Sequence, residues 1–297
     1  YCKATKHRGG FYLLYRIHNL HFLVWAAMFD GQSETAIKCC RTISQKLTAD
    51  VVKAMPAFID HYSATIWMAL IRFGMWEQIL KEPVPEDPQL FAAHIAVAHY
   101  ARGMAYAALG HVGKAEEEEK KFKNALQDPN LPARMLHTNF SYDTKGTCGM
   151  LNVAEKMLEG EILYRKGHFV EAFAALREAV KRDDGLNYDE PWGWMQPARH
   201  ALGALLVEQK QYLEAEQVFE ADLKKWPANL WAMKGLHACY QGKGDVEAAE
   251  KCSKDLKAVS ARADIDVNAA CLCANGNAKL EENEAKEACK KCEAESA

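Results

Sequence analysis

The sequence predicts an all-α fold, a right-handed α-α superhelix of about six stacked helical hairpins followed by a C-terminal capping segment. Apolar residues recur at helical spacing along nearly all of the 297 residues, and the alternation typical of strands is almost absent. Helix-breaking residues gather in four clusters, at 82–88, 128–132, 189–193 and 226–227. The stretches between these clusters have the length of paired helices, so we expect a repeat architecture.

A small residue marks the point in each predicted hairpin where the two helices cross. Gly or Ala there lets the backbones approach, while Tyr or Phe fills the space beside it. The clearest copy is residues 160–179, in which Gly160 is followed by Phe169 and Ala172. The frame recurs, more loosely in the outer copies, with its central position at Ala36, Ile79, Ala115, Ala172, Ala215 and Ala249. These positions are 34 to 57 residues apart, which is the spacing of one hairpin with or without an inserted loop.

This pattern resembles the tetratricopeptide repeat, whose unit is about 34 residues long. The resemblance implies hairpins at residues 15–47, 58–82, 92–127, 152–184, 196–226 and 229–259. The longer intervals are then explained by inserted loops at 128–150 and 183–195. Residues 1–266 form the predicted solenoid, and residues 267–297 remain as a cysteine-containing tail or capping helix. A non-repeating helical bundle is the alternative fold.

Three segments also resemble a mostly bacterial group of tetratricopeptide-like proteins of undefined role. They are His18–Phe22 (HNLHF), His99–Gly103 (HYARG) and Tyr188–Arg199 (YDEP followed by Trp, Pro and Arg). Where that group has a second proline after Glu-Pro, this chain has Trp192. The resemblance supports the fold and transfers no activity.

The family resemblance implies that the first helix of each hairpin lines a concave groove. Polar and aromatic residues at the inward positions and in the loop after residue 183 are the predicted ligand contacts: His18, His21, Trp25, His61, Arg72, Tyr100, Glu161, Tyr164, Arg165, Glu190, Trp192, Arg199 and His200. The loop could close over the groove as a lid or pack on the next hairpin. The residues of the chaperone-tail clamp are missing, because His21 and Trp25 stand in their places.

Such a groove predicts a non-enzymatic scaffold that binds a protein, a peptide or a small polar ligand. Trp and Arg are common anchors at binding surfaces because they give large contact area and paired hydrogen bonds. No HExxH, GxSxG, phosphate-loop or dinucleotide motif is present in the sequence. Catalysis is therefore the less favoured function, and no catalytic residue is predicted.

A metal-dependent enzyme or metal-binding protein is the alternative function. His18 and His21 are three residues apart and so share one helical face. With His61 or Glu161 they could ligate zinc or another transition metal. The other interpretation is a hydrogen-bonded histidine pair that orders the groove.

The C-terminal tail offers a second candidate metal site. Cys271 and Cys273 precede Cys289 and Cys292, and two thiol pairs approximate a four-cysteine zinc site. A disulfide, or a helix at 277–295 that caps the last repeat, are the alternatives.

Composition limits the remaining function classes. Lys and Arg number 37 against 40 Asp and Glu, a net charge of −3, so no nucleic-acid partner is predicted. The apolar runs are too short to span a membrane, and the mean hydropathy of −0.30 predicts a soluble protein. The ten cysteines are scattered through helical patterns, which favours a reduced compartment such as the cytoplasm. The chain begins at Tyr1 without Met, so we expect a fragment or processed product; the sequence leaves the oligomeric state open.

Overall fold

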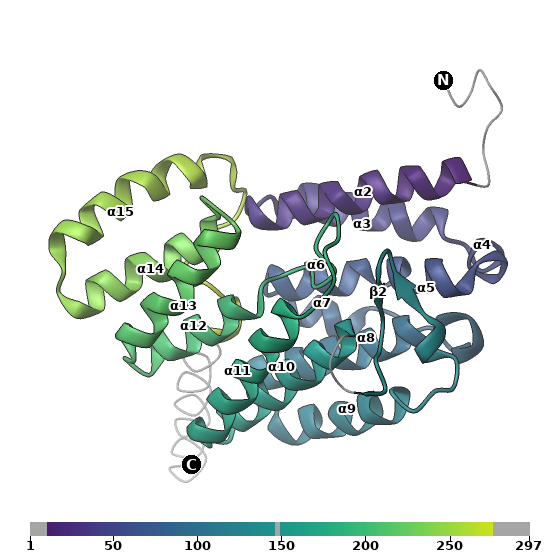
Figure 1. The fold of residues 1–297 in the computed structure, drawn as a ribbon. Coiled ribbons are helices and arrows are strands. Elements are labelled where there is room, and N and C mark those ends of the chain that lie inside the picture. Colours follow the sequence, from purple (N-terminus) through teal and green to yellow (C-terminus); the bar gives the residue numbers. More distant parts are fainter. Residues whose placement is uncertain (1–10, 146–148, 276–297) are drawn as a thin grey trace, which may run out of the picture.

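The computed structural model, which describes residues 11–145 and 149–275, is a row of helical hairpins (Figure 1). The paired helices are α2 (Phe11–Phe29) with α3 (Ser33–Lys46), α5 (Pro56–Ser63) and α6 (Thr65–Arg72) with α7 (Trp76–Lys81), α8 (Pro88–Ala108) with α9 (Val112–Ala125), α10 (Met150–Arg165) with α11 (Phe169–Asp184), α12 (Ala198–Glu208) with α13 (Tyr212–Lys225), and α14 (Leu230–Lys243) with α15 (Val246–Val259). A short helix, α4 (Ala49–Ala54), separates the first two hairpins. The predicted all-α solenoid of helical hairpins is confirmed.

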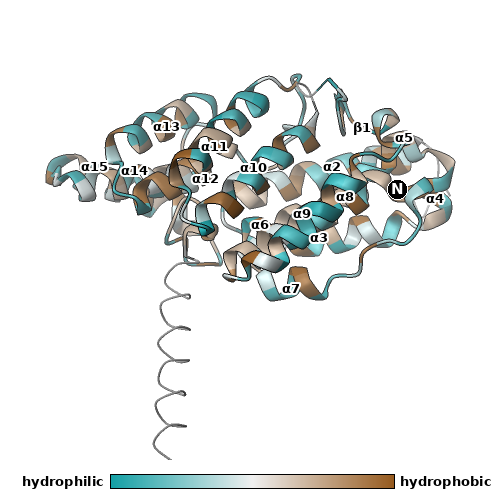
Figure 2. Cartoon of the chain, turned by 90° about the horizontal axis from the view of Figure 1, so that it is seen from below, coloured by the Kyte–Doolittle hydropathy of each residue, from teal (hydrophilic) through white to brown (hydrophobic). Residues whose placement is uncertain are grey.

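Except in the hairpin of α2 and α3, the first helix of a hairpin is more deeply buried than the second. α8 buries most of its residues, whereas α9 buries only Ala115, Glu118 and Phe122. Figure 2 shows the corresponding difference in hydropathy, with hydrophilic residues prominent along α9. The first helices therefore form the central layer, and the functional side chains that they carry point into the protein.

Each hairpin turns at a residue in the left-handed region. In five hairpins this residue is a glycine with φ between 60° and 80°, namely Gly31, Gly74, Gly110, Gly167 and Gly244. In the hairpin of α12 and α13 it is Lys210, with φ 59°. Glycine adopts this conformation without a Cβ clash, which explains its recurrence at the turn.

The small residues predicted at the helix crossings are in close contact with large ones. A Cβ atom on Gly203 would lie 2.4 Å from the ring of Phe219, and one on Gly235 would lie 2.1 Å from the same ring. Phe219 is fully buried between them. The aromatic ring thus occupies the space that the two glycines leave open.

Substituting Gly235 by Ala is expected to lower the free energy of unfolding by about 1–3 kcal/mol, because the rigid ring of Phe219 cannot move away from the added methyl group. Urea denaturation measures this change. The matched control is Gly113→Ala in α9, where nothing lies within 4 Å of the added Cβ. That variant should change the free energy of unfolding by less than about 0.5 kcal/mol, because Gly113 lies in the first turn of α9 and its added methyl group meets no neighbour. A loss of equal size in both variants would contradict close packing at Gly235.

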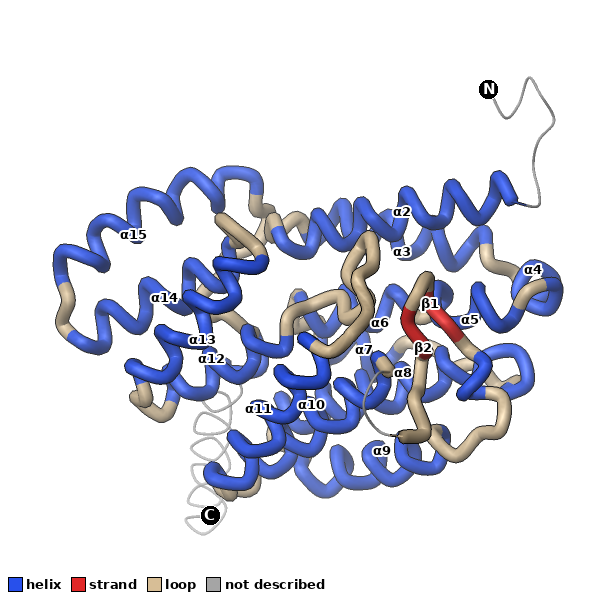
Figure 3. Tube along the Cα trace, viewed as in Figure 1, coloured by secondary structure: helices blue, strands red, loops and turns tan. Residues whose placement is uncertain are grey.

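Two inserted loops cover the N-terminal first helices. The first contains a 3-10 turn, η1 (Leu131–Ala133), and an antiparallel pair, β1 (Met135–Leu136) and β2 (Asn139–Phe140). The sequence did not predict these strands, which lie beside α5 (Figure 3). Asn139 joins the two loops, because its Nδ2 donates to the Asn187 carbonyl at 3.1 Å and its Oδ1 accepts from the Asn187 amide at 2.9 Å. This bond network fixes the loop around residue 189 against the β-hairpin.

The chain after α15 returns to the first hairpin through η2 (Ser260–Arg262) and ends at η3 (Leu272–Asn275). Asp264 accepts from the amides of Ser33 at 2.7 Å and Glu34 at 2.9 Å, and thereby caps α3. Figure 1 shows this yellow segment running from α15 past the end of α2. Residues 267–275 thus cross the protein, while the predicted helix at 277–295 lies outside the described residues.

A second contact joins the last hairpin to the first. The indole Nε1 of Trp231 in α14 donates to the Met28 carbonyl of α2 at 2.8 Å, and both residues are fully buried. Arg262 also forms an ion pair with Asp30 at 2.8 Å. The two ends of the hairpin row are therefore bonded to each other.

No helix within residues 11–145 and 149–275 combines the length and apolar character needed to cross a membrane.

Candidate ligand site at the histidine cluster

Four imidazole rings gather where the inserted loops cover α2 and α5. We call them the histidine cluster: His18 and His21 from α2, His61 from α5, and His137 from the turn between β1 and β2. The ring centroid of His137 lies 5.2 Å from that of His18 and 5.7 Å from that of His21. The sequence placed the three helical histidines on one inner surface, and the structure brings them together there. His137 was not predicted.

His137 is held in an unusual conformation by a buried carboxylate. Its φ of 51° lies in the left-handed region, which costs a residue other than glycine about 1 kcal/mol or more. Its Nδ1 lies 3.1 Å from Oδ1 of Asp189. Oδ2 of Asp189 accepts from the Thr138 amide at 3.2 Å and from Asn139 Nδ2 at 3.0 Å. A carboxylate only accepts, so Nδ1 of His137 donates, and in the tautomer that carries its proton on Nδ1 the Nε2 atom is a hydrogen-bond acceptor.

Burial keeps the helical histidines uncharged. Burial lowers the pKa of His21 well below its usual value, and His137, His61 and His18 add to this effect. Burial and His137 together lower the pKa of His61 to about 4. The pKa of His18 is lowered by burial and His137, against the opposing carboxylates of Asp189 and Glu190. Near neutral pH the rings of His18, His21 and His61 are therefore uncharged.

Two buried ring nitrogens in the cluster have no hydrogen-bond partner within the described part of the chain. They are Nδ1 of His21 and Nε2 of His137. The ring of Tyr62 contacts both histidines, with centroids 5.1 Å from His21 and 5.2 Å from His137. A buried polar atom without a partner costs about 1–3 kcal/mol, so a group that bonds to either nitrogen would be stabilised here.

The metal site expected from His18, His21 and His61 is not assembled. No group of three His, Cys, Asp or Glu side chains in the described ranges is placed to hold a metal ion. Nδ1 of His61 instead bonds to Oγ of Ser141 at 2.9 Å. Glu161, the other ligand considered, pairs with Arg165 in a different part of the protein.

Arg72 and His200 belong to a second buried cluster and do not line an open groove. Nη2 of Arg72 lies 3.0 Å from Nδ1 of His200, whose Nε2 lies 2.8 Å from Oδ2 of Asp222. The Arg72 guanidinium carbon is 3.5 Å from the ring centroid of Trp231. Burial lowers the pKa of Arg72 well below its usual value, and Asp222 opposes this shift. This cluster links hairpins, and the predicted ligand role of both residues stays a prediction.

Tyr100, Glu161, Tyr164 and Arg165 form a third buried cluster. Nε of Arg165 donates to Oε1 of Glu161 at 2.8 Å, and Tyr164 Oη accepts from Gln209 at 2.9 Å. Nη2 of Arg165 donates to the Cys273 carbonyl at 2.6 Å. The chain's own C-terminal segment thus occupies the place where the sequence predicted a ligand.

Part of the loop after residue 183 packs on the neighbouring helices, and another part lies against the histidine cluster. Trp192 is buried and donates to Asp183 at 2.8 Å, and Arg199 pairs with Asp184, so this part packs on its own hairpins. Asp189 reaches over the histidine cluster, and exposed Glu190 lies near His18. Trp192 and Arg199 thus anchor this loop to its own hairpins, and their predicted ligand role stays a prediction.

Trp25, one helical turn after His21 on α2, lines an aromatic cavity of about 570 Å³. The cavity is also lined by Phe29, Trp226 and Pro227. The predicted groove residues thus occur in several clusters within the described part of the chain.

Cys271 and Cys273 are joined by a disulfide. Disulfide sulfurs are not thiolate ligands, so this pair is not available for the predicted zinc site. Cys289 and Cys292 lie outside the described residues.

No family model, no curated protein and no solved structure matches this chain.

Proposed function

We propose that the protein is a non-enzymatic scaffold of the tetratricopeptide type that binds a small polar ligand at the histidine cluster. The observation that carries this proposal is the pair of buried ring nitrogens without partners, His21 Nδ1 and His137 Nε2. The loop bearing Asp189 provides the cover of the site, and the α2 and α5 helices provide its floor. Ligand sites with a few placed polar groups among aromatic rings are typical of small-molecule recognition.

The chemistry of the site favours a ligand that donates hydrogen bonds. With Nδ1 of His137 directed at Asp189, its Nε2 accepts. The carboxylates of Asp189 and Glu190 lie near His18 and oppose the lowering of its pKa, so they also favour a positive charge bound beside it. The faces of Tyr62 and the histidine rings can contact a cation. A small amine or hydroxyl compound fits these features better than a carboxylate does.

Replacing His137 by Asn is expected to weaken the binding of ethanolamine, used as a small amine and hydroxyl probe, by at least about tenfold. Asn tolerates the left-handed backbone but removes the accepting ring nitrogen. The dissociation constant is measured from the NMR shift of the His21 ring during titration. Acetate, a carboxylate probe, should produce no saturable shift.

The matched control is Lys210→Asn, the same replacement at an exposed non-glycine residue with φ 59°. It should leave ethanolamine binding as in the parent protein, and circular dichroism should show that both variants keep their helices. Equal dissociation constants in the parent and His137→Asn would refute the site.

A further inference from the structure

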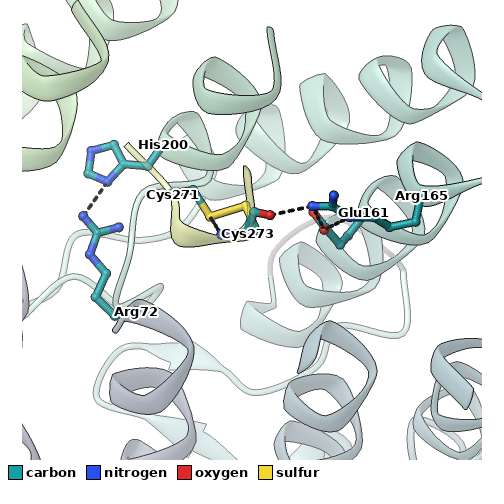
Figure 4. The surroundings of a disulfide bond; sticks show 6 residues. All are labelled: Arg72, Glu161, Arg165, His200, Cys271 and Cys273. Carbon is teal, nitrogen blue, oxygen red and sulfur yellow. Dashed lines mark hydrogen bonds and ion pairs between the residues drawn. A yellow bond between two sulfur atoms is a disulfide. The ribbon is translucent and has the colours of Figure 1, made fainter. Parts of the chain in front are cut away.

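The segment 264–275 lies over the inner helices and fills the third buried cluster. η3 contacts both α8 and α12, and Ala270 and Cys273 are fully buried. Leu272 packs against the turn at Gly74, where an added Cβ would lie 3.1 Å from the Leu272 Cβ. Figure 4 shows the Cys271–Cys273 turn between the Arg72–His200 pair and the Glu161–Arg165 pair. Residues 264–275 therefore occupy a binding surface on the inner helices of the same chain.

The surface beneath this segment matches a peptide main chain. The Arg165 side chain is fully buried and donates to a main-chain carbonyl, that of Cys273, at 2.6 Å. Oε2 of Glu161, whose Oε1 pairs with Arg165, is buried and has no partner among the described residues. The surface therefore offers a donor to a carbonyl and an acceptor to an amide. A peptide backbone carries both groups in alternation, whereas a free carboxylate carries acceptors only.

The disulfide fixes the turn that makes this contact. Cys271 and Cys273 are separated by one residue, and the Cys273 amide also donates to Cys271 Sγ at 3.4 Å. Cys271 is half-buried, so its sulfur is the one that a reductant can approach, while Cys273 is enclosed. Opening the bond frees the backbone of three residues, and each freed residue gains conformational entropy.

We propose that residues 264–275 are a redox-gated plug, and that its release exposes a groove for an extended peptide of another protein. A dithiol reductant attacks Cys271 Sγ, the S–S bond breaks, and Cys273 leaves as a thiolate that takes up a proton. The second thiol of the reductant completes the exchange, so two cysteine thiols form while the reductant becomes a disulfide. The incoming peptide then places a carbonyl at Arg165 and an amide at Glu161.

The test uses the full chain and a fluorescein-labelled synthetic peptide of residues 261–275 with both cysteines replaced by serine. The oxidised protein should not bind this probe, and dithiothreitol should strengthen binding at least about tenfold by releasing the tethered competitor. The C271S/C273S variant should bind without reductant. Arg165→Gln should abolish binding in the reduced protein.

Two further measurements make the outcome decisive. The C289S/C292S variant keeps the 271–273 pair and should respond to dithiothreitol as the parent does; loss of the response there would overturn the proposal. Amide hydrogen exchange of residues 264–275 should rise on reduction, while that of α10 stays constant. Equal protection of the segment in both redox states would also overturn it, even if the C271S/C273S variant fails to fold.

Discussion

Replacing Asp222 by Asn is expected to lower the free energy of unfolding by about 3–5 kcal/mol, because it leaves the buried Arg72 guanidinium without a nearby anion. Asp222 and Arg72 are both buried, and His200 lies between them, in contact with both. Asn has nearly the same volume, so the loss measures charge and not packing. Urea denaturation at pH 7 provides the measurement.

The control for Asp222 is Glu220→Gln, which removes an exposed carboxylate from the same helix. It should change the free energy of unfolding by less than about 0.5 kcal/mol. Arg72→Met combined with Asp222→Leu should recover much of the loss, since both buried charges are then absent. A loss below about 1 kcal/mol in Asp222→Asn would show that Arg72 does not depend on this carboxylate.

Acid should lower the free energy of unfolding partly because His61 becomes protonated in the unfolded chain. His61→Gln should remove this contribution to the acid-induced loss of stability. Burial lowers the pKa of His61 in the folded state to about 4, from an ordinary value of 6.5. The unfolded chain therefore takes up a proton at His61 more readily than the folded chain does. Stability that is present above pH 6.5 is lost as the pH falls toward 4.

At 1.36 kcal/mol per pH unit, His61 accounts for about 2–3 kcal/mol of lost stability between pH 6.5 and 4.5. Over this pH interval the free energy of unfolding of His61→Gln should fall by about 2–3 kcal/mol less than that of the parent. Urea denaturation at each pH measures it. Ser141→Ala is the control, because it removes the hydrogen-bond partner and keeps the buried ring; its pH dependence should follow that of the parent. Parallel curves for His61→Gln and the parent would contradict the lowered pKa.

An opposing contribution comes from Asp183. Burial raises its pKa to about 6, so the folded protein holds this proton more tightly than the unfolded chain. Asp183 therefore adds stability as the pH falls from 6 toward its ordinary value of 3.8. For this reason the comparison of variants, and not the parent curve alone, isolates His61.

The hairpins could be predicted from the sequence because their signals are local. Gly203 and Phe219 occupy corresponding positions in the two helices of one predicted hairpin, and the structure shows Gly203 and Gly235 against the ring of Phe219. The inner face of α2 was predicted for the same reason, since His18 and His21 are one turn apart.

The covering parts of the candidate site could not be predicted. His137 lies in a loop without periodicity, and its partner Asp189 is 52 residues away along the chain. Arg165 was placed correctly on an inner helix, yet its contact with Cys273 spans 108 residues. Such contacts depend on how the whole solenoid curves, which no single repeat encodes.

The bonds between the first and last hairpins have a consequence for how the fold comes apart. A linear array of repeats can unzip from either terminus, because each end unit has one neighbour. Here Asp264 holds the start of α3 and Trp231 holds the end of α2, so each terminal hairpin has support on two sides. Unfolding of one terminal hairpin therefore requires its contacts with the other terminal hairpin to break. We expect the hairpins to unfold together in one cooperative transition.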